Sequence, residues 1–224
     1  MNAMIKPSTR GGVAPLPNYV PSGNECDIFE AAWRNKLPLL IPQDHLPEQA
    51  ARIAALLAAN LNAFAFDFVL RQKLQGQTIN LFILEQLPVI APARFDEPLP
   101  AAFAKAMRAA RLMNGRHPRP SVADFVIPQV LALSYTAHDL APFARDLGYV
   151  DAAGAPLPPI VWNDDERRAR LAALDALFFW LYGLGADDAA YVMAQFPIVR
   201  EQDERAFGRF RTCEDVLDWL RHVV

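Results

Sequence analysis

The alternation of apolar and polar residues predicts a chain that is mostly helical. An alanine-rich and leucine-rich stretch runs from Pro47 to about Lys73, and Gly76 follows it. Proline suits the first turn of a helix and glycine suits the residue after its end. We therefore expect this stretch to form the longest helix of the chain.

Two short stretches depart from helical spacing. One is the apolar run Lys36–Pro42, which lies between prolines and favours an extended segment. The other is Thr78–Leu84, whose β-favouring residues have the length of a strand, with Pro88 and Pro92 beyond it. The second stretch is the clearest strand that the pattern predicts.

The end of the chain is expected to be entirely helical. Asn163–Glu166 has the residue types of an N-terminal capping box, and Gly183 is expected to stop the helix. Between them, apolar residues recur at helical spacing: Leu171, Leu174, Leu177, Phe178 and Leu181. A further helix is expected at residues 187–195, before Pro197, and a last one from Thr212, which begins a second box-like sequence.

In the middle of the chain the pattern predicts shorter helices. One runs from about Ala101 to Met113, one from Gln129 to His138 with Pro128 near its start, and one around residues 140–147. The expected fold class is therefore α+β and predominantly helical. Short β segments near 37–42 and 78–91 would pack with helices, and an all-helical C-terminal part would follow. We expect the parts to divide as 1–120, with an irregular N-terminal arm, and 121–224.

Composition and charge indicate where the protein is located and what it could bind. The richest apolar run, 53–70, is interrupted by polar residues, so no membrane span is expected. The N-terminus lacks the apolar region of a secretory signal, and two cysteines cannot build a disulfide framework, so a cytoplasmic location is expected. Residues 61–120 carry eight bases and four acids, whereas residues 121–224 carry nine bases and sixteen acids. Such asymmetry is typical of a nucleic-acid-facing segment beside an acidic scaffold, and it also arises on ordinary solvated surfaces.

Two blocks of sequence resemble a known family. The first is the stretch LNAFAFDFVLRQKLQGQTINLFILEQLPVIAP at 61–92. The second begins with LSYTAHDLAPFARDLGY at 133–149 and continues through Trp162, DERR at 165–168, LDALF at 174–178, LYGL at 181–184, FPIVR at 196–200, Phe207-Gly and Arg211-Thr212. Both blocks are similar to the C-terminal regions of large adenine-specific DNA methyltransferases of restriction-modification systems and of phage-defence systems such as BREX and DISARM.

The resemblance implies a place at the target-recognition side of such an enzyme, with the catalytic domain upstream. S-adenosylmethionine would be the cofactor of that parent enzyme, and this chain alone would hold no catalytic residue, cofactor or metal. Consistent with this, the sequence has no Asn-Pro-Pro-Tyr-like tetrapeptide for a flipped adenine. The nearest string, LPPI at 157–160, lacks the amide and the aromatic ring. His138 stands where the family pattern leads us to expect tryptophan.

A polar patch surrounds Gly76 and is a candidate DNA contact. Arginine and lysine neutralise phosphates, and glutamine and asparagine amides pair with base edges. The same residue types are typical of a polar turn exposed to water, and Asn80 would also serve to satisfy backbone groups inside the fold. The members of this patch are Arg71, Gln72, Lys73, Gln75, Gln77, Thr78 and Asn80.

A second basic segment lies between Pro98 and Ala123, which has five bases and no acid. A basic helix followed by a basic loop could follow a phosphate backbone, and each neutralised phosphate would add salt-dependent affinity. A solvated helix face explains the pattern equally well. The bases are Lys105, Arg108, Arg111, Arg116 and Arg119, with His117 beside them.

Other chemistry has weaker support in the sequence. His117 and the pair His138-Asp139 are reminiscent of ligands in metal-dependent phosphohydrolases, but such sites need several convergent ligands and the chain has four histidines. Ser134, Cys26 and Cys213 have no evident base beside them, so we interpret them as structural. The aromatic cluster at 178–182 is expected to lie in the core or at an interface.

The sequence thus leads to two hypotheses. In the first, the chain is a non-catalytic DNA-recognition or structural module of an adenine-specific methyltransferase, with duplex DNA and the catalytic domain or subunit as partners. In the second, it is a helical protein-interaction module that docks on a catalytic subunit without touching DNA.

Overall fold

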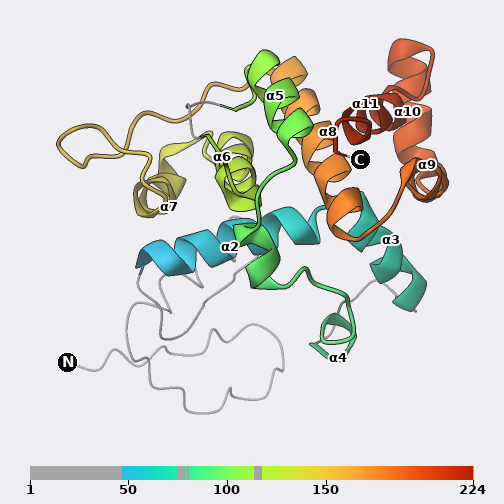
Figure 1. Cartoon of the computed structure of the whole chain (residues 1–224), viewed down its shortest axis with the longest axis horizontal. Coiled ribbons are helices and arrows are strands. Elements are labelled where there is room, and N and C mark those ends of the chain that lie inside the picture. The colour runs from blue at the N-terminus through green and yellow to red at the C-terminus, as the bar shows by residue number, and fades with distance from the viewer. Residues whose placement is uncertain (1–46, 75–78, 80, 114–117, 224) are drawn as a thin grey trace, which may run out of the picture. The chain divides into compact units, whose positions relative to one another are not determined.

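The computed structural model describes residues 47–74, 79, 81–113 and 118–223 (Figure 1). In these residues the chain is helical, and it contains no β-strand, only the two isolated bridges Pro98–Ser121 and Val150–Pro156. The elements in chain order are α2 (Pro47–Leu61), α3 (Phe64–Lys73), α4 (Leu81–Leu84), η1 (Pro92–Asp96), α5 (Ala101–Ala109), α6 (Val122–Ser134), η2 (His138–Leu140), α7 (Ala141–Asp146), α8 (Asp164–Leu181), α9 (Ala186–Ala194), α10 (Pro197–Phe207) and α11 (Arg211–Leu220).

The α+β prediction is therefore wrong for the described residues. The clearest expected strand, Thr78–Leu84, is replaced at Leu81–Leu84 by one turn of helix, α4. The N–H groups of Gln86 and Leu87 donate to the carbonyls of Ile83 and Leu84, so the backbone is satisfied locally. β-propensity reflects how well side chains fit a sheet, and no neighbouring strand is present in this part of the structure. The other expected β segment, 37–42, lies outside the described residues.

The long helix expected from Pro47 to Lys73 is two helices that meet at an angle of 68°. Asn62 folds back to donate from Nδ2 to the carbonyl of Ala58, and Ala63 is the extended residue before α3. Alanine offers no side chain to cap the new helix. The longest helix in the described part of the chain is instead α8, with 18 residues.

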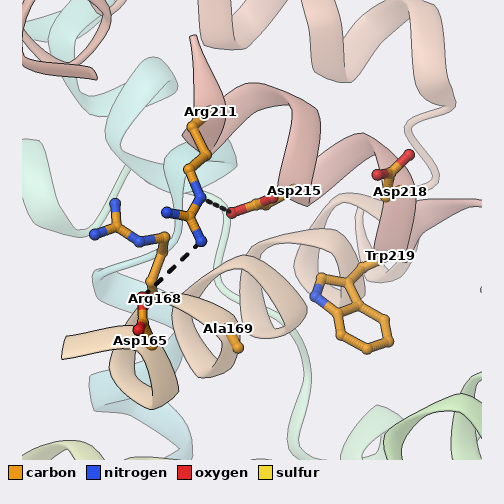
Figure 2. Close-up of a pocket in the computed structure, with 7 residues that line it drawn as sticks. All are labelled: Asp165, Arg168, Ala169, Arg211, Asp215, Asp218 and Trp219. Carbon is orange, nitrogen blue, oxygen red and sulfur yellow. Dashed lines mark ion pairs between the residues drawn. The ribbon is translucent and has the colours of Figure 1, made fainter. Parts of the chain in front are cut away.

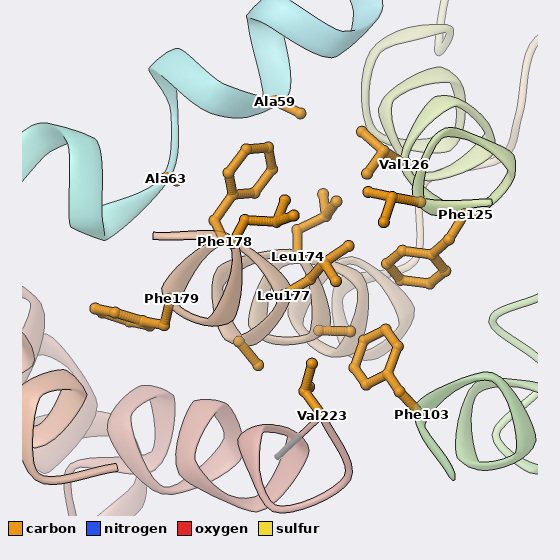
Figure 3. Packing of buried hydrophobic residues seen from close by; sticks show 14 of the residues in the cluster. Ala59, Ala63, Phe103, Phe125, Val126, Leu174, Leu177, Phe178, Phe179 and Val223 are labelled. Carbon is orange, nitrogen blue, oxygen red and sulfur yellow. The ribbon is translucent and has the colours of Figure 1, made fainter. Parts of the chain in front are cut away.

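α8 lies at the centre of the hydrophobic core. Every residue from Ala172 to Phe179 is buried, including Asp175, so this stretch of the helix is surrounded on all sides. Figure 3 shows Phe178 next to Ala59 of α2 on one side of the core, and Phe103 and Phe125 facing one another on another side. The core contains side chains from both sides of residue 120. The expected core role of the aromatic cluster is confirmed for Phe178 and Phe179, which are fully buried.

Several helix ends follow the local sequence as expected. Asn163 accepts a hydrogen bond from the N–H of Glu166 at 2.9 Å and begins α8. Gly183 follows α8 with a φ of 74°, in the left-handed region that glycine adopts without strain. The all-helical C-terminal part is confirmed within the described residues.

Other boundaries were predicted incorrectly. Pro128 lies inside α6, not at its start, because Ser121 and Asp124 form a capping box that begins the helix at Val122. α9 ends before Pro197, as expected. Pro197 is also the first residue of α10, a helix that the pattern did not predict. The last helix starts at Arg211, and Asp203 of α10 accepts the N–H of Thr212.

Within the described residues no single helix is long and apolar enough to cross a membrane. Two bent pairs, α2 with α3 and α8 with α9, meet the length and composition criteria only together, with bends of 68° and 119°.

Candidate nucleic-acid interface

The first candidate patch is described only in part. Arg71, Gln72 and Lys73 are exposed at the end of α3, whereas Gln75, Gln77, Thr78 and Asn80 lie outside the described residues. Arg71 is already engaged within the protein, because its Nε and Nη2 both donate to Asp67 Oδ2, at 3.0 and 2.9 Å. Its guanidinium also lies 4.7 Å from the ring centroid of Phe196. Through these contacts Arg71 connects α3 with the start of α10, which gives it a structural role.

A buried carboxylate positions the helix that carries this patch. Asp175 of α8 accepts the N–H of Phe64, the first residue of α3, at 2.8 Å. It therefore caps α3 in place of the side chain that Ala63 lacks. Burial raises the pKa of Asp175 to about 7, although the hydrogen bond from Phe64 acts in the opposite direction. Asp175 does not line the surface cavity that the described residues form between α8 and α11, and we interpret it as a structural group.

A second buried polar group holds the same region. Asn60 is fully buried, and its Nδ2 donates to Tyr182 Oη at 2.6 Å. Its Oδ1 accepts the N–H of Ile90 at 2.9 Å, and Tyr182 Oη donates to the carbonyl of Pro88 at 2.8 Å. Asn60 and Tyr182 thus join α2, the end of α8 and the segment after α4.

The second candidate segment is a closed excursion of the chain, which we call the basic arm (residues 99–120). Its two ends are joined by backbone hydrogen bonds from Leu99 N to Pro120 O at 2.8 Å and from Val122 N to Glu97 O at 2.9 Å. Phe103 anchors α5 in the core, with its ring edge-on to Phe125 and Trp219 at centroid distances of 5.3 and 6.5 Å. The arm is therefore anchored where it leaves the fold and where it returns to it. It carries all five basic residues of the segment.

Three cations of the basic arm are exposed and form no ion pair with another described residue: Lys105, Arg111 and Arg119. Arg108 is half-buried, and Arg116 and His117 lie outside the described residues. In contrast to Arg71, these three side chains have no ionic partner in the part of the chain that the structure describes.

Arg111 has an unusual backbone conformation. Its φ of 59° places it in the left-handed region, which costs a side-chain-bearing residue about 1–2 kcal/mol. It follows the end of α5, and Leu112 N donates to the carbonyl of Met107 at 2.9 Å, closing the helix. A glycine would satisfy this geometry better than an arginine does.

The described parts of the two candidate segments do not form one surface. α3 packs on α9, where Phe68 meets Tyr191, while α5 packs on α6 and α11 through Phe103. Figure 1 shows α3 and α5 well apart. Arg71 of the first patch, which is bound by Asp67 and Phe196, is therefore distant from the exposed cations of the basic arm.

A surface cavity of about 270 Å³ lies between α8 and α11 (Figure 2). Arg211 extends between two acids, with its Nε 3.5 Å from Asp215 and its Nη2 4.0 Å from Asp165. Arg168 lies beside them, and its Nε is buried without a hydrogen-bond partner among the described residues. Asp165, Arg168 and Arg211 occur in the second family-like block, but no sequence motif marks them as a site. The opposite charges of Arg211 and Asp215, at i, i+4 spacing in the last helix, could have indicated it. The cavity contains charged groups of both signs but no pair of nucleophile and base.

The alternative chemistry finds no support in the described residues. His138 and Asp139 are exposed in η2, and no group of three possible ligands converges on a metal position in this part of the chain. The Ser134 hydroxyl donates to the carbonyl of Val130 at 2.7 Å. Burial raises the pKa of the half-buried Cys213 thiol, which makes it a poor nucleophile at neutral pH. Cys26 lies outside the described residues.

Comparison with protein-family models, with curated proteins and with solved structures gives no match.

Proposed function

We propose that this chain is a non-catalytic DNA-recognition and structural module of an adenine-specific DNA methyltransferase of a restriction-modification or phage-defence system. In this proposal the basic arm contacts the phosphate backbone of duplex DNA. A catalytic domain or subunit, which binds S-adenosylmethionine, is the other partner. The observation that carries the DNA contact is a set of exposed cations, Lys105, Arg111 and Arg119, which form no ion pair with another described residue and lie on an arm whose two ends are joined by hydrogen bonds.

The packing of the two family-like blocks is consistent with the proposed parentage. Asp175 of the second block caps α3 of the first, and the ring of Phe64 lies edge-on to Phe196 at a centroid distance of 4.7 Å. The described parts of the two blocks therefore pack against each other, as expected if they descend together from one larger fold.

Replacing Lys105 and Arg119 together by glutamate is expected to weaken binding to a fluorescently labelled DNA duplex by about tenfold or more. Each phosphate contact that is lost should also lower the slope of log K against log salt concentration by about 0.9. Fluorescence anisotropy at several salt concentrations measures both quantities. Arg205→Glu, a charge reversal at an exposed cation of α10, is the matched control and should leave affinity and slope unchanged.

Arg111→Gly separates the loss of charge from damage to the fold. It removes one cation, and it should stabilise the protein because glycine adopts a positive φ without strain. Weaker DNA binding by a variant with an undiminished melting temperature would support direct contact. If the Lys105 and Arg119 double variant binds with the same affinity and the same salt slope as the original chain, the basic arm does not contact DNA.

The second candidate function is docking on a catalytic subunit without DNA contact. The segment around α4 favours it, because its apolar side chains Ile79, Phe82, Leu84 and Val89 are exposed, Phe82 by 71%. Exposed apolar residues that form a contiguous patch are typical of protein-interaction sites. The DNA titration distinguishes the two functions, since an interaction module has no reason to show a salt-dependent slope that depends on the basic arm.

A further inference from the structure

A buried glutamine connects α8 with the turn that follows α5. Gln129 of α6 is 1% exposed, and its Nε2 donates to the carbonyl of Leu112 at 2.6 Å. Its Oε1 accepts a hydrogen bond from Arg170 Nη1, also at 2.6 Å. Burial of an amide is unfavourable unless its donor and its acceptor are bonded, and here both are. The two partners therefore fix the orientation of the Gln129 side chain.

Arg170 is itself held by its place on α8. Its side chain is 16% exposed, and its Nη2 lies 3.4 Å from Oε2 of Glu166, one turn earlier. The neighbouring Arg167 donates from Nη1 to the carbonyl of Leu133 at 2.8 Å. The first two turns of α8 thus hold α6 at two points, and Gln129 extends one of these connections to the basic arm.

The backbone of Leu112 is bonded on both of its sides. Its N–H donates to the carbonyl of Met107 at 2.9 Å, and its carbonyl accepts the amide of Gln129. Leu112 directly follows Arg111, whose φ is 59°. A residue with a side chain remains in this conformation only where the surrounding structure fixes the backbone. The bond from Gln129 supplies part of that constraint, so it helps to determine where the arm presents Arg111.

We propose that Gln129 is a positioning residue for the DNA contact of the basic arm, and that Arg170 keeps its amide in the required orientation. This inference rests on the proposed function. Gln129 is buried and acts through the backbone of Leu112, which holds Arg111 in place before DNA binds. A cation that is already positioned loses less conformational entropy on binding a phosphate, so the affinity for DNA depends on this bond.

Gln129→Met and Gln129→Glu test the inference in the full chain. Methionine is uncharged and similar in length but forms neither hydrogen bond, whereas glutamate can accept from Arg170 but cannot donate to Leu112. Both variants should bind the labelled duplex about three- to tenfold more weakly than the original chain. The slope of log K against log salt concentration should become shallower by up to about 0.9, the contribution of one phosphate contact.

A double-mutant cycle with Arg111→Gly separates positioning from a general loss of structure. If Gln129 acts through Arg111, Gln129→Met should have little further effect on DNA affinity once residue 111 is glycine. A substitution that only weakened the fold would lower the affinity equally in both backgrounds. Hydrogen exchange at the Leu112 amide should be faster in both Gln129 variants, while circular dichroism shows that the helices remain.

Arg170→Met is a milder variant that leaves Gln129 in place and removes only the partner of its Oε1. It should lower DNA affinity in the same direction and by less. Gln195→Glu is the matched control, because Gln195 is an exposed glutamine whose Nε2 donates to the carbonyl of Tyr191 at 3.4 Å. It makes the same chemical change with the same added charge, and it should leave DNA binding unchanged.

Two results would overturn the positioning role. One is that the Gln129 variants bind DNA as tightly as the original chain while the Lys105 and Arg119 double variant binds more weakly. The other is that the effects of Gln129→Met and Arg111→Gly on affinity are simply additive. If the Lys105 and Arg119 double variant itself binds as the original chain does, the proposed function fails and the positioning role fails with it.

Discussion

Asp175→Asn is expected to stabilise the protein at pH 8 by about 1–3 kcal/mol and to give much less benefit at pH 5. The pKa of Asp175 is about 7 in the folded protein, against an ordinary value of 3.8 for an aspartate side chain. Between these two values the folded state holds a proton that the unfolded state has lost, so the contribution of Asp175 to stability falls as pH rises and then levels above pH 7. Asparagine can still accept the N–H of Phe64, but it never becomes charged.

The measurement is urea unfolding of both proteins at a series of pH values from 5 to 8. Because each pKa unit corresponds to roughly 1.4 kcal/mol, the difference between variant and original should grow by about 2–3 kcal/mol over this range. The buried amide N–H₂ of the variant costs some of the gain, since it needs its own acceptor. Comparison at each pH cancels the titration of all other groups.

Asp165→Asn is the matched control for this experiment, because Asp165 lies on the same helix with its side chain exposed. It should change the free energy of unfolding by about 0.5 kcal/mol or less at every pH in the range. A difference between Asp175→Asn and the original that is the same at pH 5 and pH 8 would show that the buried carboxyl is already ionised at pH 5.

Asn60→Ala is expected to destabilise the protein by about 2–4 kcal/mol. The substitution leaves the buried N–H of Ile90 without an acceptor and removes a hydrogen bond to the hydroxyl of Tyr182. Each buried polar group left unsatisfied costs about 1–3 kcal/mol. Chemical unfolding followed by circular dichroism measures the loss.

The neighbouring Asn62 provides a control of the same chemistry. It is exposed, and its side chain donates only to the carbonyl of Ala58, so Asn62→Ala should cost about 0.5 kcal/mol or less. Equal effects of the two substitutions would contradict a joining role for Asn60. Tyr182→Phe should reproduce part of the loss, since it removes the hydroxyl that bridges Asn60 and Pro88.

The sequence was enough to predict which residues belong to the candidate interface. It was not enough to predict which of their side chains are bound by other residues of the fold. The absence of acids between Pro98 and Ala123 is visible in the sequence, and it led to the basic arm. The engagement of Arg71 by Asp67 at i, i+4 was also within reach of local reasoning. The stacking of Arg71 on Phe196 was not, because those residues meet only through the packing of α3 on the C-terminal helices.

By itself, the sequence determined the features that depend on neighbouring residues: the start of α8 at Asn163, its end before Gly183, and the helical character of the C-terminal part. Capping and periodicity act within one or two turns, so they can be read locally. The tertiary structure alone decided that α2 and α3 are separate helices and that 81–84 is a helical turn. The capping acceptor for Phe64 lies 111 residues away, and the partner of Asn60 lies 122 residues away. The local pattern cannot show that a distant carboxylate stabilises a break between two helices. Nor can it show that a segment of β-favouring residues has no neighbouring strand to pair with.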